Sequence, residues 1–174
     1  MSKIIEKKMN VIQHLQGIFR PHTIEAAIGI ASFLHQGVFD KGGNPYIRHP
    51  MWVANQIALN GGNQNEVICG WLHDTIEDTP LTSVELSYWF NPEIVAAVQS
   101  VSFKCEGHEN EERNDYIRRV AMNPIGRKVK MFDLKHNMDI TRLKNRHCLA
   151  QKDLERIKIY AEEYDFLVGG AIGV

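Results

Sequence analysis

One short segment, residues 71–79, gathers an imidazole and three carboxylates of the kind that bind a metal ion or move protons. If the segment is helical, steps of about 100° per residue place these four side chains on one sector, opposite an apolar face. Such a group of carboxylates is repulsive unless a cation lies among them. A solvated acidic face usually alternates with Lys or Arg, yet only Arg48 lies between Lys41 and Lys104. The segment therefore predicts either an exposed acidic helix end or a divalent metal site beside a catalytic pair, built from His73, Asp74, Glu77 and Asp78.

Two residues far from this segment could complete a metal site. His49 precedes Pro50, which suits the first position of a helix, so its ring could turn toward a neighbouring helix or simply cap its own. Asp133 lies in an apolar run, and a buried carboxylate must be paired or bound to a metal. Either a Lys or Arg partner or a metal ion satisfies that requirement. Asn137, four residues later, shares the helical face of Asp133.

The segment 37–48 contains Gly42, Gly43 and Pro45, which predict a loop. Glycine lets backbone N–H groups approach an anion closely, and Lys41 adds a positive charge. The loop is therefore either a phosphate-binding loop or an ordinary turn, and its composition alone leaves both possibilities open.

The remaining pattern predicts an all-α fold with about eight to ten helices, because apolar residues recur at helical spacing and no stretch shows β alternation. Pro and Gly punctuate these runs. We expect residues 1–174 to form one domain with a motif-bearing core over about 23–145. An N-terminal helix at 3–19 and a C-terminal helix at 149–167 should pack on this core, and the stretch 64–78 should be one central helix.

Composition narrows the classes of partner. A net charge of −1 offers no general attraction for nucleic acid or an acidic membrane surface. No apolar run approaches the roughly 20 residues of a membrane span, and residues 1–10 do not read as a signal peptide. The three cysteines are scattered, which favours a reducing, cytoplasmic setting and disfavours a thiolate zinc site. A homo-oligomer is compatible with this composition.

The order His49, His73-Asp74, Asp133 resembles the HD-domain metal-dependent phosphohydrolase superfamily. The closer similarity is to the hydrolase domain of the RelA/SpoT homologues and to their single-domain relatives, the small alarmone hydrolases. Three segments carry it, and they are residues 35–50, 72–79 and 130–137. The middle segment, Leu-His-Asp-Thr-Ile-Glu-Asp-Thr, is highly specific, whereas an isolated His-Asp pair is not.

The resemblance implies roles for individual residues. It implies one divalent ion, usually Mn²⁺ in this family, and a set of two imidazoles and two carboxylates suits such a borderline metal. Glu77 and Asp78 would form the catalytic pair, with the assignment of acid and base left open. The implied metal ligands are His49, His73, Asp74 and Asp133. The implied substrate contacts are Asn137 with the nucleoside, Lys41 and Tyr46 at the border of the site, and Arg142 with phosphate.

The implied reaction removes the 3′-pyrophosphate from guanosine 3′,5′-bis(diphosphate) or its pentaphosphate analogue, and yields GDP or GTP plus pyrophosphate. Asp40 departs from the family pattern, which commonly has Arg before the loop lysine. Two alternatives to this reaction stay open, and Asp40 favours the first of them. One is an HD phosphohydrolase acting on another phosphorylated nucleotide, such as a nucleoside phosphate or a reduced dinucleotide phosphate. The other is a metal- or nucleotide-binding regulatory module without turnover, against which the presence of both Glu77 and Asp78 argues.

Overall fold

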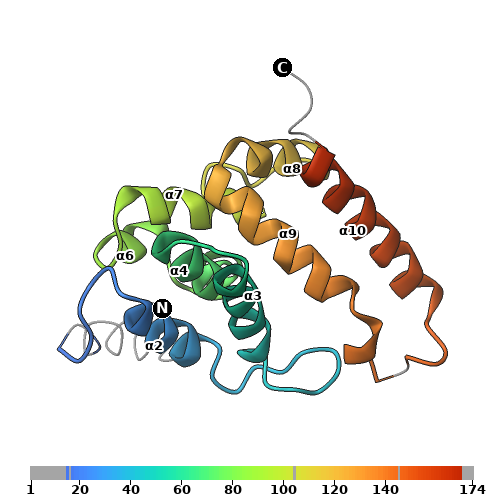
Figure 1. The fold of residues 1–174 in the computed structure, drawn as a ribbon, viewed down its shortest axis with the longest axis horizontal. Coiled ribbons are helices and arrows are strands. Elements are labelled where there is room, and N and C mark those ends of the chain that lie inside the picture. The colour runs from blue at the N-terminus through green and yellow to red at the C-terminus, as the bar shows by residue number, and fades with distance from the viewer. Residues whose placement is uncertain (1–14, 16, 104, 145, 170–174) are drawn as a thin grey trace.

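The computed structural model describes residues 15, 17–103, 105–144 and 146–169. These residues form α-helices joined by loops, so the all-α prediction is confirmed (Figure 1). Most of the expected helix at 3–19 and the glycine-rich tail from residue 170 lie outside the described residues. The elements are α2 (Ile24–Leu34), α3 (Arg48–Leu59), α4 (Gln64–Leu72), α5 (Thr75–Asp78), α6 (Ser83–Ser87), α7 (Pro92–Val101), α8 (Arg113–Met122), α9 (Pro124–Met138), the 3-10 helix η1 (Ile140–Arg142) and α10 (Gln151–Gly169).

Local sequence explains where several helices begin. The Asn63 side chain accepts from the Glu66 amide, and the Glu66 carboxylate accepts from the Asn63 amide, which makes a capping box at the start of α4. The side chains of Asn91 and Asn123 cap α7 and α9 by accepting a backbone amide hydrogen bond, without the reciprocal contact, and each is followed by a proline in the first turn. These signals are local in the chain, so the positions of these starts are largely encoded by adjacent residues.

Helix α4 lies at the centre of the main core, where it packs against α2, α3, α7 and α9. Its buried residues, Ile68 and Leu72 among them, join apolar residues of these neighbours in one cluster. A second cluster lies where α8 and α10 pack on α9, around Tyr116, Leu134 and Leu167. Figure 1 shows α9 running between the group of α3 and α4 on one side and α10 on the other. Helix α9 therefore belongs to both cores and fixes the position of α10.

Gly70 allows α3 and α4 to approach each other closely. A Cβ atom at this position would lie 2.9 Å from the Cα atom of Ala54 and 2.9 Å from Cδ1 of Ile57. Such contacts with buried backbone cannot be relieved without a shift of one helix. The contact matters for the site because α3 carries His49 and α4 ends immediately before His73.

The expectation of one helix over 64–78 is wrong at its centre. Helix α4 ends at Leu72, and α5 begins at Thr75, with His73 and Asp74 between them. The Thr75 hydroxyl donates to the Leu72 carbonyl oxygen at 2.6 Å and so occupies an acceptor at the end of α4. Because the apolar periodicity continues from Leu72 to Ile76, the pattern itself gives no sign of this break.

The loop between α2 and α3 folds back on itself through an isolated antiparallel bridge between Phe39 and Pro45. Gly43 lies in the left-handed region, with φ of 81°, which favours glycine there. Helix α10 begins and ends two residues later than expected. None of the described helices is both long and apolar enough to cross a membrane.

Candidate metal centre and active site

Four predicted ligands come together although they belong to three separate parts of the chain. The Nε2 atoms of His49 and His73 lie 3.1 Å apart. Nε2 of His49 is 3.5 Å from Oδ2 of Asp74 and 3.0 Å from Oδ1 of Asp133. Nε2 of His73 is 3.0 Å and 3.8 Å from the same two oxygens. Four donor atoms therefore face one small volume. They come from the start of α3, from the break between α4 and α5, and from α9.

This donor set fits a divalent ion. Metal–ligand bonds of about 2.1 Å place neighbouring ligand atoms roughly 3 Å apart in an octahedral site, close to the separations observed here. The electrostatics agree with the geometry. Burial alone would lower the pKa of His73, but the carboxylates of Asp74 and Asp133 raise it well above the ordinary value. The two carboxylates thus favour positive charge at this point, as a proton or as a metal ion.

Backbone contacts orient His73. Its Nδ1 lies 2.8 Å from the carbonyl oxygen of Gly70, one turn earlier. A carbonyl can only accept, so Nδ1 carries the proton, and Nε2 of a neutral ring is left with a free lone pair. Metal-binding histidines commonly make this kind of outer contact. The end of α4 therefore presents His73 in the form that a metal requires.

Asp133 is buried, and Lys130 supplies the cationic partner that its sequence context offered as one of two possibilities. Lys130 donates to Oδ2 at 2.7 Å, and Asn137 donates to Oδ1 at 2.6 Å. Burial would raise the pKa of Asp133, but Lys130 and the nearby imidazoles hold it well below its usual range. The carboxylate is therefore ionised, with Oδ1 shared between Asn137 and the ligand cluster. The ion pair with Lys130 does not exclude the metal role, because it uses the other oxygen.

His136 is a site residue that the sequence analysis missed. Its Nδ1 lies 2.7 Å from Nδ1 of His49, and both rings are buried. Burial, then the charge of Arg142, lowers the pKa of His136 to about 3, so this ring is neutral. No short motif links the two histidines, because 87 positions separate them. Its place three residues after Asp133 on one helix was the available signal.

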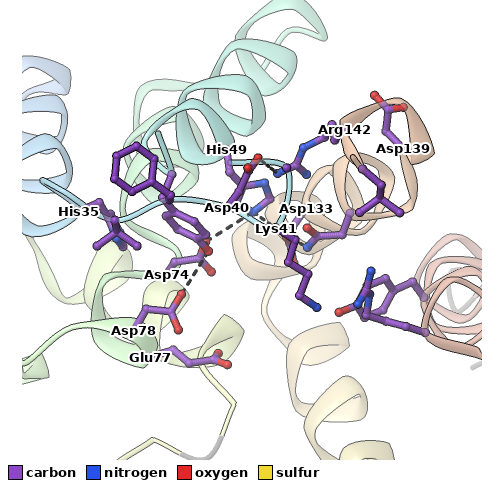
Figure 2. Close-up of a pocket in the computed structure, with 18 of the residues that line it drawn as sticks. His35, Asp40, Lys41, His49, Asp74, Glu77, Asp78, Asp133, Asp139 and Arg142 are labelled. Carbon is purple, nitrogen blue, oxygen red and sulfur yellow. Dashed lines mark hydrogen bonds and ion pairs between the residues drawn. The ribbon is translucent and has the colours of Figure 1, made fainter. Parts of the chain in front are cut away.

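The expected catalytic pair lies beside the ligand cluster. The Tyr46 hydroxyl donates to Oδ2 of Asp74 at 2.6 Å and is 3.1 Å from Oδ2 of Asp78. Oε2 of Glu77 accepts from the backbone amide of Phe103 at 2.7 Å. Removal of water in the pocket raises the pKa values of Glu77 and Asp78, and the charge of Asp74 raises them further. Figure 2 shows Glu77, Asp78 and Asp74 on the same side of the pocket.

A cavity of about 610 Å³ opens onto the ligand cluster and the carboxylate pair. This volume is in the range of sites for small molecules and cofactors. Every predicted site residue except His73 lines it, and His73 lies buried directly behind, 3.0 Å from the lining residue Asp74. Lining residues that the sequence analysis did not select include His35, Arg113, Lys130, Asp139, Arg156 and Tyr160.

Asp40 and Arg142 both line this cavity and lie within ion-pair distance of each other. Nη2 of Arg142 lies 3.5 Å from Oδ2 of Asp40, and its Nη1 donates to the backbone oxygen of His136 at 2.8 Å. Oδ1 of Asp40 accepts from the Asn44 amide at 2.8 Å. Burial raises the pKa of Asp40, but the Asn44 hydrogen bond and the Arg142 charge outweigh it and lower the pKa. The acid is thus a partner of Arg142 and of the loop backbone.

A cluster of positive charge lies at the end of the cavity formed by α10. Lys41 extends from the loop into the pocket (Figure 2). Burial lowers its pKa, and the like charges of Arg156 and Lys152 lower it further. Arg156 pairs with Asp153 at 3.0 Å, which neutralises only part of this charge. Cations held together around a cavity favour an anionic group between them.

The curated relatives of this chain are named either GTP pyrophosphokinase or guanosine-3′,5′-bis(diphosphate) 3′-pyrophosphohydrolase. No family model matches the chain. A GTP pyrophosphokinase of Streptomyces coelicolor is 31% identical over 143 residues, which make up 79% of this chain and 17% of that protein. A guanosine-3′,5′-bis(diphosphate) 3′-pyrophosphohydrolase of Haemophilus influenzae is 34% identical over 116 residues, or 63% of this chain and 17% of that protein. The chain thus spans about a fifth or less of the length of these curated relatives.

Among solved structures, a metazoan orthologue of SpoT described as hydrolysing ppGpp has the same fold. The TM-score is 0.69 at 19% identity, over 83% of this chain and 84% of that one. The helical fold with its His…His-Asp…Asp cluster defines the HD-domain class. Within that class, the chain belongs to the RelA/SpoT homologues, as relatives that are 30–31% identical over 79% of this chain show.

Proposed function

We propose that this protein hydrolyses the 3′-pyrophosphate bond of guanosine 3′,5′-bis(diphosphate), or of its pentaphosphate analogue, with the help of a divalent metal ion. Water adds to the phosphorus of the 3′-pyrophosphate, and the bond to the ribose 3′-oxygen breaks. The products are GDP or GTP and pyrophosphate. Relatives named as enzymes of this reaction support the proposal, and so does the fold shared with the metazoan SpoT orthologue.

One observation carries the proposal. The donor atoms of the four ligand residues converge within a few ångströms, and two further carboxylates line the same cavity. A binding module needs ligands for its metal but has no need of Glu77 and Asp78 with raised pKa values beside them. A pyrophosphokinase must hold two nucleotides at once, whereas one cavity of about 610 Å³ suits a single nucleotide.

We propose Mn²⁺ as the resident ion, held by His49, His73, Asp74 and Asp133. A mixed set of imidazole and carboxylate ligands, with no thiolate, suits Mn²⁺ and similar borderline metals. When bound, such an ion polarises phosphoryl oxygens and lowers the pKa of water. Ligand atoms of His49, His73 and Asp74 all lie within 4.8 Å of one another, and this close grouping supports a single-ion site.

The chain's own carboxylates handle the protons. Tyr46 holds Asp78 next to Asp74 by donating toward both, so Asp78 faces the ligand cluster. The Phe103 amide holds the Glu77 carboxylate at the pocket wall. The raised pKa values of both groups lie closer to neutral pH than those of ordinary carboxyl groups. A carboxylate with such a pKa can take a proton from the attacking water and give one to the leaving 3′-oxygen.

The charge of the pocket suits a nucleotide that carries phosphate at two places. The 3′-pyrophosphate would lie at the ligand cluster, close to Asn137, which donates to Asp133. The second phosphate group would lie toward the positive end formed by Lys41 and Arg156. Tyr46 and Arg142 also line the cavity, Tyr46 in contact with Asp74 and Arg142 in contact with Asp40.

The pair of Asp40 and Arg142 favours a second candidate function. This contact uses part of the positive charge that a highly anionic alarmone would require. A nucleotide with fewer phosphates, such as a nucleoside phosphate or a reduced dinucleotide phosphate, would lose less from it. The observation concerns the choice of substrate and leaves the proposed reaction type unchanged.

A panel of substrates tests the proposal. The purified protein is incubated with Mn²⁺ and guanosine 3′,5′-bis(diphosphate), GTP, or a reduced dinucleotide phosphate, and the products are identified by chromatography. We expect GDP and pyrophosphate from the first substrate, and no turnover by the Asp74→Ala protein. Release of orthophosphate from another nucleotide, with no action on the alarmone, would replace the first proposal with the second candidate. A protein that binds Mn²⁺ but converts nothing would contradict both.

A further inference from the structure

The contact between His49 and His136 constrains where the proton of His49 lies. The two Nδ1 atoms are 2.7 Å apart, so one of them donates and the other accepts. The ring planes differ by only 4°, and the ring centres are 4.9 Å apart. Because each nitrogen lies about 1.1 Å from its ring centre, the two rings meet edge to edge in nearly one plane. This is the favourable in-plane direction for an imidazole hydrogen bond.

His136 is itself held in a fixed orientation. Its ring stacks on Trp52, with ring centres 4.3 Å apart and planes 7° apart. His136 lies in the last turn of α9, and its backbone oxygen accepts a hydrogen bond from Nη1 of Arg142 at 2.8 Å. Trp52 belongs to α3, one turn after His49, so α3 supplies both the ring that His136 stacks on and the ring that it bonds. The fixed ring of His136 therefore restricts the orientation of the His49 side chain.

The other nitrogen of His49 decides the direction of this hydrogen bond. Nε2 of His49 faces Nε2 of His73 at 3.1 Å and Oδ1 of Asp133 at 3.0 Å. A metal at that point requires a bare lone pair on Nε2, and a neutral imidazole then carries its proton on Nδ1. Nδ1 of His136 must then accept the hydrogen bond that Nδ1 of His49 donates.

We propose that His136 is a positioning residue, which accepts a hydrogen bond from Nδ1 of His49 and so presents Nε2 of His49 unprotonated to the metal. The inference rests on the metal site in the proposed function. It assigns to His136 no contact with substrate and no step in proton transfer. Its effect is on metal affinity, and through that affinity on turnover.

Two substitutions separate this role from simple packing. His136→Asn keeps an acceptor oxygen near the position of Nδ1 but removes the ring that stacks on Trp52. His136→Phe keeps a flat ring for the stack but offers no acceptor. A packing role predicts that Phe is tolerated better than Asn, because it fills the buried space and retains the aromatic contact. The positioning role predicts the opposite order for metal affinity.

The test measures Mn²⁺ binding directly and uses no substrate. Mn²⁺ is added to metal-free wild-type and variant proteins, and the free ion is followed by its EPR signal. Thermal unfolding of the same samples reports packing. We expect His136→Phe to weaken Mn²⁺ binding by about 10- to 100-fold and His136→Asn to remain within about threefold of wild type. We expect the melting temperature of the Phe variant to be the higher of the two.

Equal Mn²⁺ affinity in the Phe variant and the wild type would overturn the positioning role and leave the proposed function standing. Failure of the wild-type protein to bind any divalent ion would overturn the metal site and the inference together. If neither variant folds, the wild-type protein decides the question. The ¹⁵N shifts of its Zn²⁺-loaded form, with His49 assigned by His49→Asn, show a protonated Nδ1 if the proposal holds. A bare Nδ1 on His49 contradicts it.

Discussion

The hydroxyl of Tyr46 lies 2.6 Å from Oδ2 of Asp74, and this contact joins the loop before α3 to the metal corner. The same hydroxyl is 3.1 Å from Asp78, so one donor serves a ligand and a member of the catalytic pair. Burial raises the pKa of Tyr46, and the negative charges of Asp74 and Asp78 raise it further, so the hydroxyl remains protonated. The loop therefore helps to keep two like charges side by side.

Tyr46→Phe removes this donor and keeps the ring. We expect kcat to fall by about 10- to 100-fold, because Asp74 and Asp78 lose their shared hydrogen bond and repel each other. The melting temperature should change little, since the aromatic contact of Tyr46 with His35 and His49 is retained. Steady-state kinetics and thermal unfolding measure the two effects. Wild-type kcat in this variant would show that the hydroxyl plays no part.

Asp74→Ala and Glu77→Gln should separate metal binding from proton transfer. Asp74→Ala removes a proposed ligand, so we expect loss of bound metal together with turnover. Glu77→Gln leaves the four ligands intact, so we expect a normal metal content and a kcat lower by about 10²- to 10⁴-fold. Metal analysis of both purified proteins, beside a rate assay, measures this. Full turnover by a metal-free Asp74→Ala protein would refute the site.

Glu77→Gln should also change how stability depends on pH. The pKa of Glu77 is raised in the folded protein, so the folded state binds its proton more tightly than the unfolded chain does. Stability of the wild type therefore falls as pH rises from about 4.3, the ordinary glutamate value, through the raised folded pKa. We expect the metal-free Gln variant to be more stable than wild type at pH 7 and equal to it below about pH 4. Urea unfolding at both pH values measures the difference. A Gln variant that is less stable at pH 7 would contradict the raised pKa.

Arg156→Gln tests the positive end of the pocket. We expect KM for a nucleotide with phosphate at two places to rise about tenfold, with kcat nearly unchanged, because a charge-assisted contact far from the reacting bond is lost. Lys158→Gln is the matched control on the same helix, since Lys158 is exposed and does not line the cavity. Equal KM values for both variants would mean that Arg156 does not contact the substrate.

Gly70→Ala tests the close approach of α3 and α4. The added methyl group would meet Ala54 and Ile57 at 2.9 Å, so we expect a loss of about 1–3 kcal/mol in the free energy of unfolding. Gly169→Ala is the control, because nothing lies within 4 Å of a Cβ atom there. Urea unfolding of both variants gives the comparison. A neutral Gly70→Ala variant would show that the two helices adjust without cost.

Much of the helical framework could be predicted because its signals are local. Capping by Asn63 and Asn91 and the apolar periodicity of α4 and α7 depend only on residues within a few positions. The break at His73 and Asp74 could not be predicted in this way, because the apolar pattern continues through it. The Thr75 hydroxyl bond to the Leu72 carbonyl oxygen accompanies the break, and the two residues in it contact His49 of α3 and Asp133 of α9, which lie far away in the sequence.

The sequence by itself determined which functional groups are available. They are the two imidazoles and two carboxylates of the proposed ligand set, and the two acids one turn beyond His73 and Asp74. Residue type sets what a side chain can donate, accept or ligate, and helical spacing sets which neighbours share a face. Only the tertiary structure decided that His136 stands behind His49, that Asp40 engages Arg142, and that Arg156 of α10 faces the same cavity. These partners lie 87 to 102 positions apart or on separately packed helices, and their meeting depends on how α9 packs between the two cores, which no local pattern records.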